Sequence, residues 1–251
     1  MPATRVNLPL YLPQWLYQPL RRVKRAFSTA SDGIDLRGDR DVEWSYIAAQ
    51  MPQGPGEALD FGCGGGNLSL LAAQSGYHVT ALDLAPHFFF WNHDGVSVVK
   101  GDLLTLKLPE NYFDVIINCS SIEHVGLVGR YGVAEKRDDG DLNAMKRMRE
   151  LMKPGAIMLL TSPCGRDAVF APLHRVYGGQ RLPLLLSGFE LQKETYWKKA
   201  RDNRWRQTSR EEALDYQPTA DFENVAACTY ALACVVLKKP AAGGTQSQNR
   251  A

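Results

Sequence analysis

Short apolar segments alternate along this chain with segments of helical character. The apolar segments are residues 57–61, 78–83, 96–100, 113–118 and 156–160. Each is bounded by turn residues, as is typical of buried strands. Residues 68–73 and 141–152 instead carry apolar side chains at helical spacing, with Asp141 placed to cap the second helix. Strands that alternate with helices form parallel βαβ units, so we expect an α/β fold with a Rossmann-like, doubly wound, mostly parallel sheet.

Composition narrows the class of protein. The 251 residues are 45% hydrophobic and 22% charged, which fits one globular domain. Lys and Arg number 29 against 27 Asp and Glu, and this balance gives no reason to expect a nucleic-acid partner. The five cysteines include no C-x-x-C pair, so we expect neither a zinc site nor a disulfide framework. A cytoplasmic location fits best.

The two ends of the chain differ in composition from its middle. Residues 1–40 are interrupted by prolines and include the basic run 21–25, and residues 238–251 are polar and rich in Gly and Ala. We expect an irregular arm over 1–40, one domain over 41–237 that begins with a helix, and a disordered tail over 238–251. The arm either packs over the domain with its basic run in solvent or makes weak contact with a membrane surface.

A glycine cluster lies where the first predicted strand becomes a helix. A dinucleotide fingerprint, G-x-G-x-x-G counted from Gly62, requires glycine at position 67, which is Asn67. The glycines present are Gly62, Gly64 and Gly66, and Asp60 precedes them. A carboxylate there disfavours a pyrophosphate and favours a cationic or amino-bearing ligand.

Two further acids end the next two predicted strands. Asp83 is placed to accept hydrogen bonds from ribose hydroxyls, and Asp102 ends the strand after it. Three acids beside a glycine turn suit an adenosine that carries a positive charge and an amino acid tail. S-adenosylmethionine has this chemistry.

On these motifs the chain resembles the class I S-adenosylmethionine-dependent methyltransferases over about residues 55–165. The Lys153-Pro154-Gly155 turn is also typical of that family. The resemblance implies a seven-stranded sheet, a donor-binding core over 55–165 and an acceptor-side insertion over 163–215, with S-adenosylmethionine as the cofactor. It implies that the segment from Asp60 to Gly66 holds the methionyl part, that Asp83 holds the ribose and that residues 101–103 contact adenine. Residues 118–121 would then lie beside the methyl group. The cofactor-binding residues expected are Asp60, Gly62, Gly64, Gly66, Asp83, Leu84, Asp102, Leu103 and Asn118.

A narrower similarity lies in residues 121–126, 130–132, 139–142 and 174–178. This set resembles poorly characterised bacterial methyltransferase-like proteins associated with glycan biosynthesis. It favours a sugar or glycan acceptor over other small hydroxyl compounds.

Two residues after the fourth strand are the catalytic candidates. His124 has the chemistry of a general base near neutral pH, and Glu123 would orient it or bind the acceptor. The alternative is that these two residues begin a helix and that His124 only caps or packs. Some family members hold a divalent cation with Glu-x-x-Glu-His, but here Ser120 replaces the first glutamate. We therefore expect no metal.

The insertion contributes the candidates for acceptor binding, which are His174, Arg175, Tyr177 and Arg181. Arginine and tyrosine there suit a sugar or a phosphate-bearing compound. The alternative is a stabilising loop whose arginines are solvated.

The function expected is methylation of oxygen on a sugar, glycan or other small hydroxyl acceptor. Methylation of carbon or nitrogen in a small natural product stays open, because the donor motifs are common to all three reactions. A nicotinamide-dependent oxidoreductase and a non-catalytic S-adenosylmethionine-binding module are the rivals from other classes. The sequence does not indicate an oligomeric state.

Overall fold

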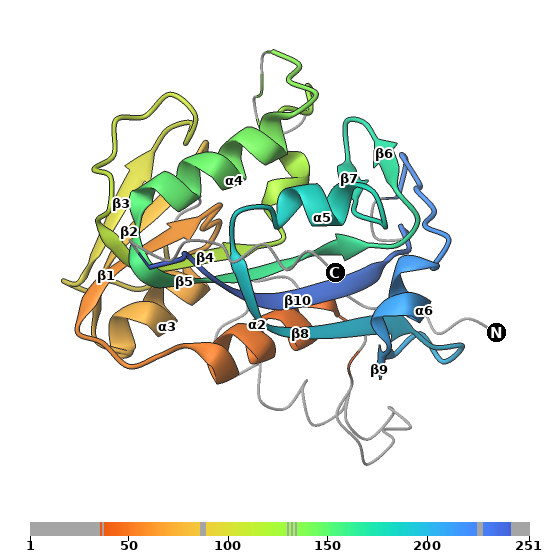
Figure 1. Ribbon diagram of the computed structural model, residues 1–251, viewed down its shortest axis with the longest axis horizontal. Coiled ribbons are helices and arrows are strands. Elements are labelled where there is room, and N and C mark those ends of the chain that lie inside the picture. The colour runs from red at the N-terminus through yellow and green to blue at the C-terminus, as the bar shows by residue number, and fades with distance from the viewer. Residues whose placement is uncertain are drawn as a thin grey trace, which may run out of the picture. The chain divides into compact units, whose positions relative to one another are not determined.

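A central sheet organises the computed structural model, which describes residues 36, 38–85, 89–129, 131, 133, 135–224 and 228–241 (Figure 1). The strand order in the sheet is β3-β2-β1-β4-β5-β10-β8-β9. The strands are β1 (Gly56–Phe61), β2 (Tyr77–Asp83), β3 (Val96–Lys100), β4 (Phe113–Cys119), β5 (Met152–Cys164), β8 (Glu190–Lys199), β9 (Trp205–Thr208) and β10 (Ala231–Lys238). All five apolar segments of the sequence are therefore strands of one sheet.

The first five strands of that order pair in parallel. Strand β10 is antiparallel to both β5 and β8, and β9 is antiparallel to β8. The Rossmann-like, mostly parallel arrangement is confirmed. The sheet has eight strands among the described residues, one more than expected, because β9 extends its edge through a hairpin with β8.

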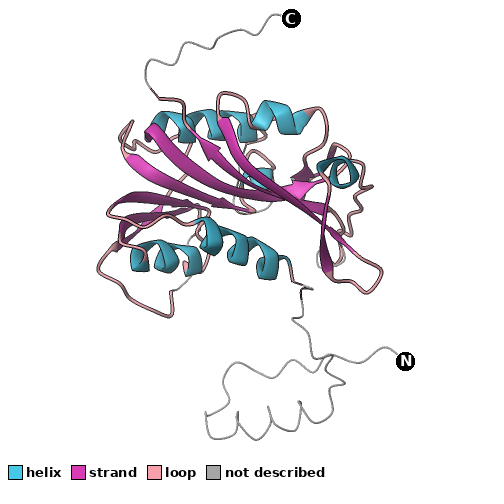
Figure 2. Ribbon diagram, turned by 60° about the horizontal axis from the view of Figure 1, so that its bottom comes forward, coloured by secondary structure: helices cyan, strands magenta, loops and turns pink. Residues whose placement is uncertain are grey.

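Helices cover both faces of the sheet (Figure 2). Helices α2 (Asp39–Gln50) and α3 (Asn67–Gln74) bury residues such as Ile47 and Ala72 in one apolar core. Helices α4 (Gly140–Leu151) and α5 (Arg181–Leu185) bury residues such as Met148 and Leu182 in the other. This double cover explains why the central strands read as continuous apolar runs rather than as alternating ones.

The segment expected as an acceptor-side insertion contributes to the sheet itself. Strands β6 (Ala168–Phe170) and β7 (His174–Val176) form a separate two-stranded hairpin, and α6 (Arg210–Leu214) follows the β8–β9 pair. The β8–β9 region buries Trp205, which is 2% exposed. Much of residues 163–215 is thus part of the folded core.

The ends of the chain are described only in part. Helix α2 begins at Asp39, inside the expected arm, and β10 ends at Lys238, where the expected tail begins. The rest of the arm, with its basic run and its predicted membrane contact, and residues 242–251 lie outside the described residues. None of the described helices has the length and apolar character needed to cross a bilayer.

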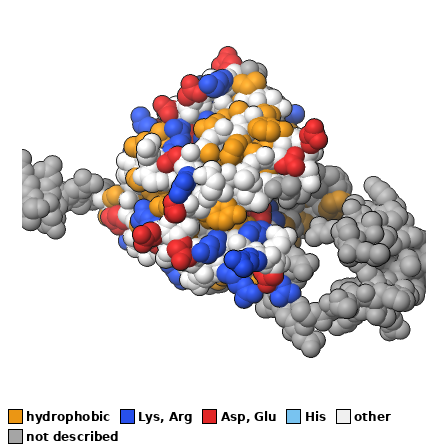
Figure 3. All heavy atoms as spheres, turned by 90° about the vertical axis from the view of Figure 1, so that its right-hand side faces the viewer, with side chains coloured by type: hydrophobic (Ala, Val, Ile, Leu, Met, Phe, Trp, Pro, Cys, Tyr) orange, Lys and Arg blue, Asp and Glu red, His pale blue; other side chains and the backbone are white. Residues whose placement is uncertain are grey.

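The face seen in Figure 3, on the side of β6 and α6, carries two kinds of surface. Hydrophobic side chains gather in one area, and Lys and Arg side chains gather in another. Val169 on β6 and Phe222 after α6 are among the exposed large apolar residues of the protein.

Candidate functional site

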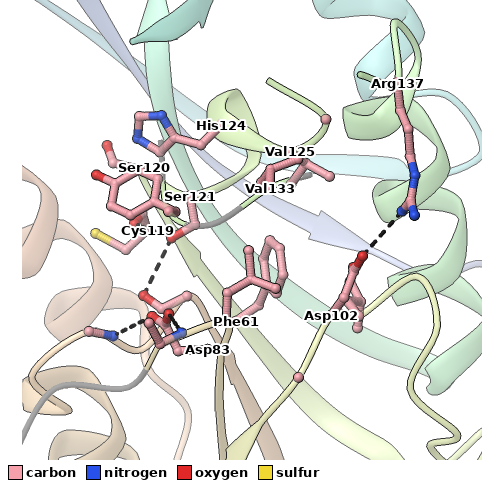
Figure 4. Close-up of a pocket in the computed structure, with 18 of the residues that line it drawn as sticks. Phe61, Asp83, Asp102, Cys119, Ser120, Ser121, His124, Val125, Val133 and Arg137 are labelled. Carbon is pink, nitrogen blue, oxygen red and sulfur yellow. Dashed lines mark hydrogen bonds and ion pairs between the residues drawn. The ribbon is translucent and has the colours of Figure 1, made fainter. Parts of the chain in front are cut away.

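The main cavity lies where the parallel strands end. Chain order runs outward from β1 to β2 and β3 on one side and to β4 and β5 on the other, so the connections diverge and leave a crevice at their carboxyl ends. A cavity of about 380 Å³ occupies this position (Figure 4). Its lining residues are Arg40, Phe61, Gly62, Gly64, Asp83, Leu84, Ala85, Gly101, Asp102, Leu103, Cys119, Ser120, Ser121, His124, Val125, Gly126, Tyr131, Val133 and Arg137.

The glycine turn after β1 forms one wall of this cavity. Gly62 and Gly64 line it with φ angles of +72° and +51°, a conformation that favours glycine. A Cβ at Gly62 would overlap the Ser121 side chain, so the turn requires glycine for packing as well. Gly66, with φ of +74°, does not line the cavity, and a Cβ there would lie 2.6 Å from the Phe89 ring. Its prediction as a cofactor contact is replaced by a role in packing.

Asp60 lies at a smaller, adjoining cavity of about 160 Å³. The lining residues of this second cavity are Arg40, Trp44, Asp60, Gly62, Cys63, Gly64, Gly65, Asn67, Leu68 and Cys119. The Asp60 carboxylate is 2% exposed and accepts a hydrogen bond from Ser69 Oγ at 2.6 Å. Burial raises the pKa of Asp60 to about 6, despite that hydrogen bond. The ionised carboxylate is therefore costly by itself and would be stabilised by a bound cation.

Asp83 and Asp102 both line the main cavity, as the sequence predicted. Asp83 accepts backbone hydrogen bonds from Gly64 at 3.0 Å and from Ala85 at 2.9 Å, which joins the end of β2 to the glycine turn. Asp102 accepts from Leu104 N at 2.9 Å and pairs with Arg137 Nη1 at 3.1 Å on one side of the cavity (Figure 4). The carboxylates keep further lone pairs for hydroxyl or amino groups of a ligand.

Of the remaining residues predicted to bind the cofactor, some line the main cavity and one does not. Leu84 and Leu103 line the main cavity. Asn118 does not: it is fully buried, and its amide nitrogen lies 3.9 Å from the sulfurs of Met145 and Met148 under helix α4. The side chain of Asn118 points to the sheet side of α4, so the residues beside the cavity at this strand end are Cys119, Ser120 and Ser121.

The sequence did not suggest an ion pair that lies beside the two cavities, between a buried carboxylate and a half-exposed arginine. Glu43 on α2 is fully buried and accepts hydrogen bonds from Arg40 Nη1 at 2.7 Å, from Thr161 at 2.9 Å and from Ser120. Burial opposes the charge of Arg40, but the surrounding groups, Glu43 foremost, together outweigh burial and raise the pKa of the guanidinium. Among the described lysines and arginines, Arg40 alone lines both cavities.

His124 lines the main cavity from a 3₁₀ turn, η1 (Ile122–His124), that follows β4. Its Nδ1 lies 2.6 Å from the carbonyl oxygen of Leu173, and its Nε2 lies 3.8 Å from Glu123 Oε1. A carbonyl only accepts hydrogen bonds, so neutral His124 carries its proton on Nδ1 and keeps the lone pair on Nε2. Glu123 is 2% exposed and is placed to stabilise the charged ring. The arrangement suits a general base.

The four insertion residues do not line the cavity. His174 is buried, and its ring packs edge-on against Phe170 and Tyr230. Arg175, Tyr177 and Arg181 converge instead on a single carboxylate, that of Asp141. The prediction that these side chains bind the acceptor is therefore corrected: they turn inward, and the arginines are not solvated as in the alternative either.

Asp141 also differs from its predicted role. The N-cap position of helix α4 is Asp139, whose side chain makes no capping hydrogen bond, and Asp141 lies in the first turn of the helix, fully buried. It accepts two hydrogen bonds from Arg181, at 2.6 and 2.9 Å, and one from Tyr177 at 3.1 Å. A buried carboxylate needs such partners, so this cluster ties α4 to α5 and to the β6–β7 hairpin.

Sequence reasoning did not assign a role in the site to the cavity residues Arg40, Tyr131 and Arg137. The ring centroid of Tyr131 lies 4.9 Å from that of His124. Arg137 lies beside the Asp139–Asp141 segment that carried the narrower resemblance, which is the available signal. No sequence signal marks Arg40. Among the described residues, no group of three or more His, Cys, Asp or Glu side chains is arranged to hold a metal ion.

Comparisons with known proteins agree with this architecture. Residues 100–222 match the family DUF268, described as a Caenorhabditis protein of unknown function. The ubiquinone biosynthesis O-methyltransferase of Xanthomonas campestris pv. campestris is 29% identical over 138 residues, 52% of each chain. The chain spans about half the length, or less, of the curated relatives it matches.

Solved structures share the fold over most of the chain. The 1,6-didemethyltoxoflavin-N1-methyltransferase of Burkholderia thailandensis, solved with S-adenosylhomocysteine, has a TM-score of 0.52 at 17% identity and covers 94% of this chain and 93% of its own. The [4+2]-cyclase SpnF has a TM-score of 0.53 at 17% identity, with 90% and 93% covered. By its sheet order and these likenesses, the chain has the fold of the class I S-adenosylmethionine-dependent methyltransferases.

Proposed function

We propose that this protein is an S-adenosylmethionine-dependent methyltransferase that methylates a hydroxyl group. The observation that carries the proposal is the main cavity, where Asp83, Asp102 and His124 lie around one space at the ends of three strands. A fold shared with a cyclase does not by itself imply methyl transfer. The proposal therefore depends on the side chains of the cavity.

The residues present fit the donor in charge and shape. The glycine turn would let a ligand approach the backbone, Asp83 lines the cavity and would accept from ribose hydroxyls, and Asp102 would lie at the adenine end. Asp60, whose pKa is raised, suits the ammonium group of the amino acid tail. When bound, the donor supplies an activated methyl group on a sulfonium.

The protein supplies the base and the dry surroundings. His124 Nε2 would take the hydroxyl proton while the acceptor oxygen takes the methyl group, which leaves a methyl ether and a charged imidazole. Glu123 Oε1, 3.8 Å from Nε2, would then balance the positive charge. Phe61, Val125 and Val133 line the cavity and exclude water.

The choice of oxygen rests on two supports. A base beside the cavity is needed for a hydroxyl and not for an amine that already has a free lone pair. The curated relatives of the donor half include O-methyltransferases of ubiquinone biosynthesis. We extend the proposal to small hydroxyl acceptors, sugars and glycans among them.

Titration calorimetry tests the donor assignment. The protein is expected to bind S-adenosylmethionine and S-adenosylhomocysteine, and Asp83→Ala to weaken both by about tenfold or more, because two ribose hydroxyls lose their acceptor. Binding of NAD with no binding of S-adenosylhomocysteine would show that the cavity serves an oxidoreductase instead.

Transfer of labelled methyl groups to sugar, lipid-linked glycan and phenolic acceptors tests the role of His124. His124→Ala is expected to lower kcat by about 100-fold or more, the usual contribution of a general base, and to leave S-adenosylhomocysteine affinity within about threefold. His93→Ala, a change outside the cavity lining, is the control. Undiminished transfer by His124→Ala would remove the proposed base.

The raised pKa of Asp60 predicts how donor affinity depends on pH. Below pH 6 the carboxyl group holds a proton that it must lose to pair with the donor ammonium, so affinity falls as pH falls through 6, by up to about tenfold per unit. S-adenosylhomocysteine titrated between pH 5 and pH 7.5 should show this trend, and Asp60→Asn should flatten it. A slope that persists in Asp60→Asn belongs to another group.

Arg40 is expected to pair with the donor carboxylate, because it is the only Lys or Arg among the residues that line the smaller cavity. Arg40→Gln should weaken S-adenosylhomocysteine by about tenfold while hardly changing affinity for its decarboxylated analogue. The comparison is made by calorimetry on both ligands. An equal loss for the two ligands would mean that Arg40 acts through packing.

A further inference from the structure

The β6–β7 hairpin contacts the catalytic turn at two points. The carbonyl of Leu173, in the turn of the hairpin, accepts from His124 Nδ1 at 2.6 Å. Two residues further on, Arg175 reaches the backbone of the same turn: its Nη1 donates to the carbonyl of Val125 at 2.6 Å and to that of Glu123 at 3.4 Å. The hairpin therefore holds both the ring of His124 and the backbone on each side of it.

Arg175 also reaches a second segment, which carries the cavity residue Arg137. Its Nη2 donates to the carbonyls of Arg137 at 3.2 Å and Asp138 at 3.3 Å. The guanidinium is 2% exposed, so its donors are shielded from water on the side of the arginine. One planar group thus joins the hairpin to the turn that carries the base and to the segment that carries Arg137, and a backbone hydrogen bond from Arg137 N to the Gly126 carbonyl at 3.0 Å links these two segments as well.

The ion pair with Asp141 does not by itself explain how this arginine is oriented. Asp141 already has the bidentate partner Arg181, at 2.6 and 2.9 Å, whereas Arg175 Nε lies 3.8 Å from it. Both terminal nitrogens of Arg175 are turned instead to four backbone carbonyls. A fork of fixed geometry can join two loops in this way, and an ammonium group cannot.

We propose that Arg175 is a positioning residue, which holds the His124 turn against the Leu173 carbonyl and thereby keeps the proton on Nδ1 and the lone pair on Nε2. The inference rests on the proposed function, in which Nε2 of His124 takes the acceptor proton. It assigns the hairpin to control of the tautomer and place of the base, rather than to contact with the acceptor.

The tautomer of His124 is measurable without any acceptor. In protein labelled with ¹⁵N-histidine, long-range ¹H–¹⁵N spectra should show neutral His124 with its proton on Nδ1, the signal being assigned by its loss in His124→Ala. A wild-type ring with its proton on Nε2 would overturn the proposal, whether or not any variant folds. If S-adenosylhomocysteine fails to bind, the donor assignment falls while this measurement still stands.

Arg175→Gln and Arg175→Lys test the brace. Both should give a mixture of tautomers at His124 and lower kcat by about tenfold or more, with S-adenosylhomocysteine affinity and the acceptor KM within about threefold. Arg147→Gln is the matched control, because Arg147 also donates to a backbone carbonyl, that of Leu108 at 3.1 Å, at the other end of α4. It should leave the His124 spectrum and kcat unchanged.

The outcomes separate positioning from stability. Melting temperatures of the Arg175 and Arg147 variants allow comparison at equal loss of stability. Full activity in Arg175→Lys, or a tautomer unchanged in Arg175→Gln, would show that the charge or the packing of this residue matters and that the fork does not.

Discussion

The site depends on a point of topology, the place of β1 between β2 and β4. From β1 the chain adds strands on one side and then crosses to add them on the other, so the segments that follow β1 and β4 leave the sheet in different directions. The crevice between them exists before any side chain is chosen. Parallel pairing places Asp60, Asp83 and Asn118 near one edge of the sheet, since Phe61 lies opposite both Leu82 and Asn118 in register.

Within that crevice, charge is arranged by burial as much as by sequence position. Asp60 and Glu43 are both buried acids near the site, but they differ in their hydrogen-bond partners. Glu43 accepts hydrogen bonds from Arg40 and from two hydroxyl groups, all of them within the protein. Asp60 has the Ser69 hydroxyl and a pKa raised to about 6, so part of its stabilisation is left for a ligand.

The parts of the fold that the sequence predicts are those with a local signature. Buried parallel strands need continuous apolar runs, and the glycine turn needs backbone conformations that other residues resist, so β1 to β5 and the positions of Gly62, Gly64 and Asp83 could be predicted. Gly66 and Asn118 share that local signature and still lie off the cavity, because packing of Phe89 and of α4 decides where they face. The position of Arg40 could not be predicted, because it depends on how α2 packs against β5.

In the insertion, polar residues suggested a binding site but are used inside the folded protein. Arginine and tyrosine in a loop suggest contact with a ligand, but His174 to Tyr177 are all buried. Once α4 places the carboxylate of Asp141 inside the protein, the lowest-energy use of nearby arginines is to satisfy it and the free carbonyls around it. Arg175 is thereby withdrawn from solvent, Arg181 stays 24% exposed, and neither lines the cavity. Because Arg175 is buried and hydrogen-bonded, it is held rigidly beside the His124 turn. A rigid donor there fixes the position of the proposed base, which a solvated arginine at the acceptor would not do.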